Sequence, residues 1–112
     1  MKAWVLHGIN DIQSEEVEKP TLSEQEVLVQ VKAFDICGSD IPRIYQTGAY
    51  SHPLISGHEF SGQVVQLGAK VDKTWQDQRV AVFPLIPCQS CPPCQKQQYE
   101  MCAHYSYLGS RQ

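Results

Sequence analysis

The alternation of apolar and polar residues predicts β-strands through most of the chain. Residues 26–34 alternate most regularly, with Val27, Val29 and Val31 on one face of the expected strand. A period of two is typical of a strand in a sheet. Four other segments are rich in β-forming residues or alternate in the same way: 2–7, 12–19, 58–67 and 79–84. The pattern therefore predicts a mostly β fold.

Two features interrupt this pattern. Gly62 is expected to break the strand that contains it, because glycine weakens a strand interior. Residues 38–46 predict a short helix, with Ser39 or Asp40 as its cap and Pro42 in its first turn.

Residues 87–103 form a segment with almost nothing to bury. It holds three prolines, five glutamines or serines and four cysteines, so something other than a hydrophobic core must order it. The cysteines are separated by two, two and seven residues, a spacing that lets thiolates converge on one ion. A zinc ion on four sulfurs has no free coordination position and stabilises the fold directly. We predict such a structural zinc site on Cys88, Cys91, Cys94 and Cys102.

Whole-chain composition favours metal over other uses of cysteine. The chain of 112 residues is 42% hydrophobic and 19% charged, with a net charge of -3, which is typical of one soluble domain. Its start does not resemble a signal peptide, and no apolar run approaches the roughly 20 residues of a membrane span. We expect a cytoplasmic protein with neither a membrane nor a nucleic-acid partner. In a reducing compartment, free thiols, an iron–sulfur cluster and a disulfide pair are the remaining alternatives to zinc.

A second set of candidate ligands lies earlier in the chain. Cys37 follows the strand over 26–34, and His58 and Glu59 come 21 and 22 positions later. Cysteine, histidine and carboxylate are the ligands of open, catalytic zinc sites. On residue type alone, a buried structural cysteine and a hydrogen-bonded core histidine are equally good interpretations.

Three motifs resemble those of the zinc-dependent medium-chain alcohol dehydrogenases. The run Gly57-His58-Glu59, followed by Gly62, Gly68 and Val71, is similar to the zinc signature of that family. The run 37–40 (CGSD) resembles its first-ligand motif, and the four-cysteine spacing resembles its structural-zinc lobe. Within the family, runs 37–44, 83–88 and 107–111 are most similar to the polyol and polyol-phosphate dehydrogenases.

The resemblance implies an oxidoreductase that binds two kinds of zinc, structural and catalytic. The catalytic zinc would be held by Cys37, His58 and Glu59, with Glu59 either a direct ligand or a neighbour of one. It would lower the pKa of a substrate hydroxyl. Ser39 would relay the hydroxyl proton, although a helix-capping role is as well supported, and Asp40 would orient His58 or cap the helix.

The resemblance also implies the substrate and the cofactor. Hydride would pass from a secondary alcohol of a polyol or polyol phosphate, with galactitol 1-phosphate as the first candidate, to NAD. Arg43 is a candidate phosphate clamp, with a solvated surface role as its alternative. Two alternative functions remain: a sorbitol- or threonine-type dehydrogenase, and a non-catalytic zinc-binding module.

Residues 1–112 would form the N-terminal part of a GroES-like β-barrel domain, including the zinc lobe over 87–103. No Gly-x-Gly-x-x-Gly run of a Rossmann domain occurs in the sequence. We therefore expect the isolated chain to be inactive. The resemblance also implies that the intact enzyme is a homo-oligomer. One departure from the family pattern is Asp77, which stands where a glycine is usual and predicts a turn with positive φ.

Overall fold

The first sheet contains the N-terminal hairpin. A computed structural model describes residues 1–111. Strand β1 (Lys2–Gly8) pairs antiparallel with β2 (Asp11–Glu16) on one side and with β4 (Leu54–Ile55) on the other. Leu6 of β1 is fully buried and packs with Ile44 and Leu54 in a small core.

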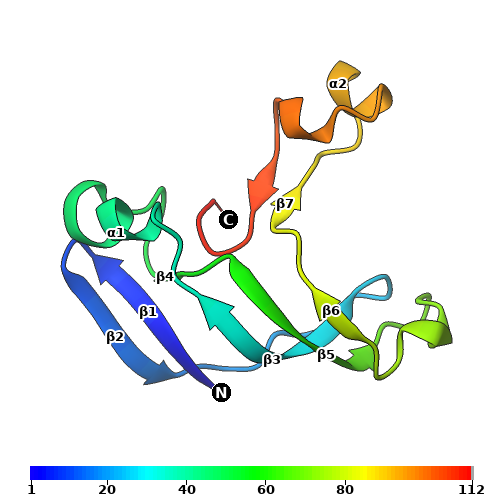
Figure 1. Ribbon diagram of the computed structural model, residues 1–112, viewed down its shortest axis with the longest axis horizontal. Coiled ribbons are helices and arrows are strands. Elements are labelled where there is room, and N and C mark those ends of the chain that lie inside the picture. Colours follow the sequence, from blue (N-terminus) through cyan, green and yellow to red (C-terminus); the bar gives the residue numbers. More distant parts are fainter. Residues whose placement is uncertain (112) are drawn as a thin grey trace.

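The second sheet carries the two segments that lead into the candidate site. Strands β3 (Val27–Asp35), β5 (Glu59–Leu67) and β6 (Arg79–Ala81) pair antiparallel in the order β3-β5-β6. The turn η2 (Lys73–Trp75) lies between β5 and β6. The two sheets stand side by side without closing into a barrel (Figure 1). Because they stay open, large apolar side chains such as Phe34 remain exposed.

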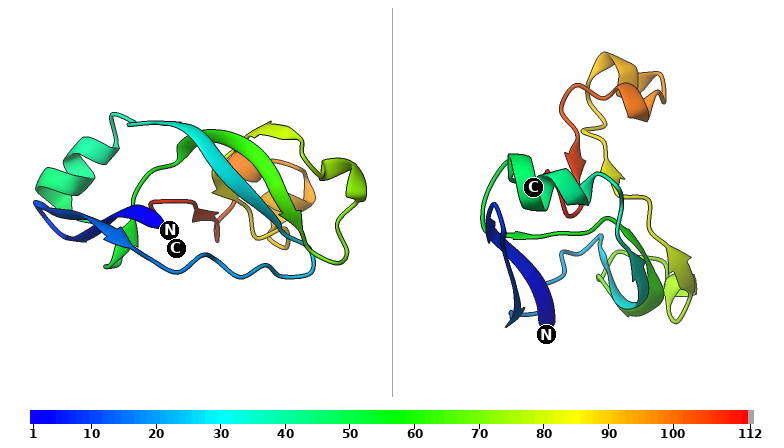
Figure 2. Two further views of the ribbon diagram at one scale, coloured as in Figure 1. Left: turned by 90° about the horizontal axis from the view of Figure 1, so that it is seen from below. Right: turned by 60° about the vertical axis from the view of Figure 1, so that its left-hand side comes forward.

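After β6 the chain forms a lobe that is connected to the sheets by a short hairpin. This hairpin, the stem, consists of β7 (Leu85–Ile86) and β8 (Ser106–Tyr107). The cysteine-rich lobe at its end contains α2 (Pro92–Gln95) and the single turn η3 (Tyr99–Met101). Figure 1 and the right-hand view of Figure 2 show this lobe projecting away from both sheets. Its cysteines therefore form a small core that is separate from the main one.

A pair of helical turns links the two sheets. The helix α1 (Asp40–Pro42) continues directly into a wider turn, η1 (Arg43–Thr47). The backbone N–H of Asn10 donates to the Ile44 carbonyl at 2.8 Å, which ties η1 to the N-terminal hairpin.

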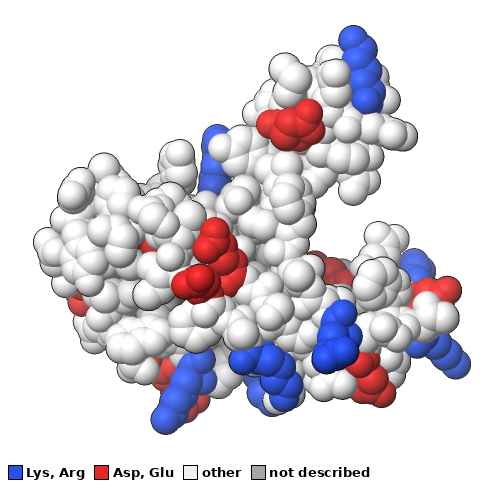
Figure 3. Space-filling view, viewed as in Figure 1, with Lys and Arg blue, Asp and Glu red and all other residues white. Residues whose placement is uncertain are grey.

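On the face shown in Figure 3, basic and acidic side chains are interspersed along the lower edge, so no continuous positive surface appears there.

The mostly β prediction is confirmed, with several corrections to detail. All five predicted strands form, although the second ends at Glu16 and the last at Ala81. The short strands β4, β7 and β8 were not predicted, because two-residue strands carry no periodic signal. The predicted helix forms as α1 and η1, with Pro42 in the first turn. Ser39 occupies the cap position but makes no side-chain capping bond.

Gly62 does not break its strand, which corrects the prediction for this residue. Strand β5 runs through it, with Gly62 opposite Val31 of β3 and Val80 of β6. A Cβ at Gly62 would lie 2.3 Å from the carbonyl oxygen of Gln30. The glycine therefore permits a close approach of β3, beside an irregularity in the β3–β5 register.

Candidate functional site

The four lobe cysteines converge as their spacing predicts. Their sulfur atoms all lie within 4.8 Å of one another. Cys88 Sγ is 4.0 Å from Cys94 Sγ, and Cys91 Sγ is 3.9 Å from Cys102 Sγ. Four sulfurs at about 2.3 Å from one zinc ion would lie about 3.8 Å apart in a regular tetrahedron. The arrangement therefore fits a single tetrahedral ion.

The same distances bear on the alternatives to zinc. All five cysteines are free, and the sulfur separations are far above the roughly 2 Å of a disulfide bond. An iron–sulfur cluster places irons and sulfides between the cysteines, so their sulfurs would lie further apart than around one ion. The geometry favours a mononuclear site over both.

Local backbone and hydroxyl groups shape this lobe. Ser90 Oγ donates to Cys88 Sγ, and hydrogen bonds from Ser90 lower the pKa of the Cys88 thiol to about 5. Burial beside the other sulfurs raises the pKa of Cys94 to about 12. A metal ion entering the lobe would meet a thiolate at Cys88 and would displace a proton from Cys94.

The second cluster is assembled by strand pairing. Cys37 follows the end of β3, and His58 and Glu59 lie at the start of β5. Asp35 pairs with Glu59 across the β3–β5 ladder, which brings the two segments together despite their separation in sequence. One ligand atom from each of Cys37, His58 and Glu59 lies within 4.8 Å of the others. Three donors at this spacing could hold a metal ion and leave a coordination position open.

A buried carboxylate supports the cluster from behind. Asp40 is 3% exposed, and its Oδ1 lies 3.6 Å from Nδ1 of His58, itself 6% exposed. The other carboxylate oxygen accepts from the backbone N–H of Cys37 at 3.1 Å. Nδ1 of His58 has no hydrogen bond among the described residues, so Asp40 is the group placed to orient the ring. Arg43 Nη1 donates to Asp40, which spreads the charge of this buried pair.

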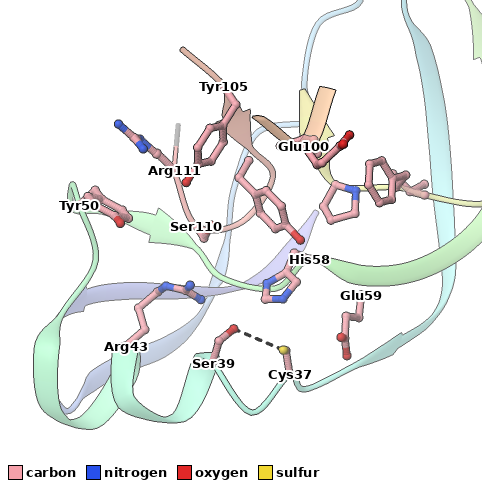
Figure 4. A pocket seen from close by; sticks show the side chains of 15 residues that line it. Cys37, Ser39, Arg43, Tyr50, His58, Glu59, Glu100, Tyr105, Ser110 and Arg111 are labelled. Carbon is pink, nitrogen blue, oxygen red and sulfur yellow. Dashed lines mark hydrogen bonds between the residues drawn. The ribbon is translucent and has the colours of Figure 1, made fainter. Parts of the chain in front are cut away.

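The cluster opens into a cavity of about 720 Å³. In Figure 4, the Cys37, His58 and Glu59 side chains lie at one side of this cavity, with Ser39 next to Cys37. Ser39 Oγ donates to Cys37 Sγ at 3.3 Å, so the hydroxyl lies beside the candidate ligands rather than capping the helix. The remaining lining comes largely from the hairpin stem and the lobe: Val82, Phe83, Pro84, Leu85, Glu100, Tyr105 and Tyr107.

The loop after β8 completes the cavity. Gly109 has φ of 65°, and a Cβ there would lie 1.8 Å from the carbonyl oxygen of Gly57. This close approach lays residues 107–111 against the segment that carries His58. The Tyr107 ring meets the His58 ring edge-on, with centroids 5.4 Å apart.

Sequence reasoning missed the cavity residues of this loop. Tyr107, Ser110 and Arg111 all line the cavity, together with Tyr50 from the other wall. Two signals pointed to the 107–111 run: its similarity to the polyol and polyol-phosphate dehydrogenases, and its glycine, which marks a turn but does not say what the turn approaches.

Comparison with known proteins identifies the family. The sequence model of the alcohol dehydrogenase GroES-like domain matches residues 23–112. The chain belongs to this family, that of the zinc-dependent medium-chain alcohol dehydrogenases. Over 88 residues it is 44% identical to galactitol 1-phosphate 5-dehydrogenase of Escherichia coli K12, a match that covers 79% of this chain and 25% of that protein.

Further relatives agree with this assignment. Sorbitol dehydrogenase of Bombyx mori is 38% identical over 113 residues, covering 96% of this chain and 32% of that protein. The crystal structure of the Escherichia coli galactitol-1-phosphate dehydrogenase superposes with a TM-score of 0.93 and 39% identity, covering 100% of this chain and 33% of that one. A putative zinc-binding dehydrogenase from Sinorhizobium meliloti, bound to NADP, superposes with a TM-score of 0.90 and 31% identity, covering 99% and 32%.

The chain spans between a quarter and a third of the length of these relatives. Among residues 1–111, no helix has the length and apolar character needed to cross a membrane.

Proposed function

We propose that this chain supplies the zinc-binding and substrate-facing part of an enzyme that oxidises a secondary alcohol of a polyol or polyol phosphate and reduces NAD. The observation that carries the proposal is the open cluster of Cys37, His58 and Glu59 beside a cavity. A module with a purely structural role has no need of an incomplete ligand set that faces a cavity of ligand size.

The side chains around the cluster have distinct roles in this proposal. Zinc bound there would act as a Lewis acid and lower the pKa of the substrate hydroxyl. Asp40 faces Nδ1 of His58, which leaves Nε2 as the ligand atom. Ser39 is placed to accept the hydroxyl proton and pass it toward solvent. A bound NAD would supply the hydride acceptor for oxidation of the alcohol carbon to a ketone.

Galactitol 1-phosphate is the substrate that we propose first. Support comes from the Escherichia coli galactitol 1-phosphate 5-dehydrogenase, which is 44% identical to this chain over the matched residues. Sorbitol is the second candidate, because the Bombyx mori sorbitol dehydrogenase is 38% identical over a longer stretch. A threonine-type substrate is the third. A nicotinamide cofactor is favoured by the NADP-bound structural relative.

A non-catalytic zinc-binding module is the alternative from another functional class. It is favoured by the lobe alone, since Cys88, Cys91, Cys94 and Cys102 form a complete and closed ligand set. Under this alternative, the open cluster would bind no metal, and the lobe would hold the only zinc.

Metal content of the purified protein separates the two functions. We expect two zinc ions per chain in the natural sequence and one in a Cys37→Ser variant, measured by elemental analysis after dialysis. A single zinc in the natural protein, retained in Cys37→Ser, would support the non-catalytic module. Reduction of NAD by the intact enzyme, rather than by the isolated chain, with galactitol 1-phosphate, sorbitol or threonine then tests the substrate. A preference for sorbitol would overturn our first choice.

A further inference from the structure

Arg111 is held in a position suited to bind an anion. Its guanidinium lies over the Tyr50 ring at 5.3 Å from the centroid and over the Tyr105 ring at 4.9 Å. The backbone of Arg111 exchanges hydrogen bonds with Tyr107 in both directions, at 2.8 and 2.9 Å, and its carbonyl also accepts from Ser106 Oγ. Backbone and side chain are thus both fixed before any ligand arrives.

The guanidinium N–H groups of Arg111 have no hydrogen-bond acceptor among the described residues. No ion pair or side-chain hydrogen bond is formed by its guanidinium within residues 1–111. Aromatic rings contact the faces of a guanidinium and leave the N–H groups at its edge free. These N–H groups match the oxygens of a phosphate ester, which a guanidinium can bind with two parallel hydrogen bonds.

Arg43, the arginine singled out from the sequence, differs in each respect. Its side chain is 15% exposed and donates to the buried carboxylate of Asp40. That contact uses its charge to balance Asp40 behind His58. Arg43 therefore supports the ligand cluster, and Arg111 is the arginine with charge available for a ligand.

We propose that Arg111, clamped between Tyr50 and Tyr105, binds the phosphate of a phosphorylated polyol whose alcohol carbon lies at the Cys37–His58–Glu59 cluster. This deepens the proposed function and rests on it. All six residues line the same cavity. In Figure 4, Arg111 and the two tyrosines lie on the opposite side of the cavity from Glu59, and Glu100 also lies away from them. The cavity thus has an acidic, metal-binding end and a basic end.

The phosphate could in principle belong to the substrate or to the dinucleotide, so the experiment treats the two separately. Binding of galactitol 1-phosphate, galactitol and NAD is measured by isothermal titration calorimetry on the intact, zinc-loaded enzyme, because this chain has no dinucleotide-binding motif of its own. Arg111→Gln should weaken binding of galactitol 1-phosphate by about 10- to 100-fold, the usual effect of losing hydrogen bonds to a charged group. Binding of galactitol and of NAD should change little.

Matched variants distinguish the specific contribution of Arg111 and its two tyrosines from the effect of removing any one positive charge. Arg79→Gln removes the same charge from β6, outside this cavity, and should leave galactitol 1-phosphate binding unchanged. Tyr105→Leu should weaken it by about two- to fivefold, because a ring contact with the guanidinium is lost. Tyr105→Phe keeps the ring and should bind as tightly as the natural protein.

Several outcomes would overturn the proposal. Equal losses for galactitol and its phosphate would mean that Arg111 only maintains the cavity. A loss confined to NAD would assign Arg111 to the dinucleotide, and no loss with any ligand would leave it without a binding role. Zinc content of each sample reports on the proposed function independently. If the open cluster holds no zinc while Arg111→Gln still weakens phosphate-ester binding selectively, then the catalytic proposal fails and the phosphate subsite stands.

Discussion

The two ligand clusters are built in opposite ways. The four cysteines of the lobe lie within 15 consecutive residues, and turns in that segment alone bring their sulfurs together. The open cluster draws Cys37 from the end of β3 and His58 and Glu59 from the start of β5. The lobe is closed and projects from the sheets, whereas the open cluster faces a cavity lined by several distant segments.

The two clusters therefore depend on different parts of the molecule. The lobe has its own small core of cysteines and buries little apolar surface, so we predict that a metal ion stabilises it. The open cluster depends on the β3–β5 register and on the Asp40 contact behind His58. Damage to one cluster should therefore leave much of the other intact.

The largest effect is expected from Cys94→Ser. Binding of structural zinc contributes about 10–16 kcal/mol of free energy in small metal-dependent folds. Loss of one of the four thiolates should therefore lower the affinity of the lobe for zinc by at least about a hundredfold. Residues 88–103 should then become sensitive to proteolysis. Zinc at the open cluster should remain, because its ligands are carried by β3 and β5. Competition with a colorimetric chelator measures both sites.

A matched control for this variant is Ser90→Ala. It removes the hydroxyl that donates to Cys88 Sγ but keeps all four thiols, so we expect zinc retention and little change in proteolysis. Loss of both zinc ions in Cys94→Ser would contradict the independence of the two clusters.

The same contrast explains what the sequence could predict. The convergence of the four lobe sulfurs could be predicted, because the spacing of Cys88 to Cys102 is a local pattern. The zinc ion on them stays a prediction. For the open cluster, residue types alone left a structural cysteine and a core histidine as equal interpretations. Only the resemblance of Gly57-His58-Glu59 to a family motif favoured a metal site over those interpretations.

The rest of the cavity could not be predicted, for a physical reason. Arg111 reaches it because Gly109 lies against Gly57, a contact between segments about fifty residues apart that no periodic pattern encodes. Arg43 stood out in the sequence because a guanidinium suits phosphate, yet its guanidinium is bound to Asp40. Our proposal therefore assigns the phosphate to Arg111 instead. The positive φ predicted for Asp77 is confirmed at 63°.

A smaller effect is expected from Asp40→Asn, which keeps the shape of the side chain and removes its charge. A carboxylate that faces a ligating histidine usually strengthens metal binding 10- to 100-fold, so zinc affinity at the open cluster should fall by about that factor. The lobe should be unaffected. Asp72→Asn, at the N-cap of η2 and outside both clusters, is the control. Equal weakening of the lobe would show that Asp40 supports the fold as a whole rather than His58.

The smallest effect is expected from Asp77→Gly, in the turn between η2 and β6. Glycine adopts positive φ without the steric cost of a Cβ, although it also gains entropy in the unfolded chain. We expect the free energy of unfolding in urea to rise by no more than about 1 kcal/mol. The backbone carbonyl of Asp77 still accepts from Gln63 Nε2 after this change, and only the exposed bond from Gln76 to the carboxylate is lost. Zinc content should stay the same at both clusters, because neither receives a ligand or a buried contact from this turn. A measurable loss of stability would instead mean that the entropy gained by the unfolded chain and the lost Gln76 bond together outweigh the relief of backbone strain.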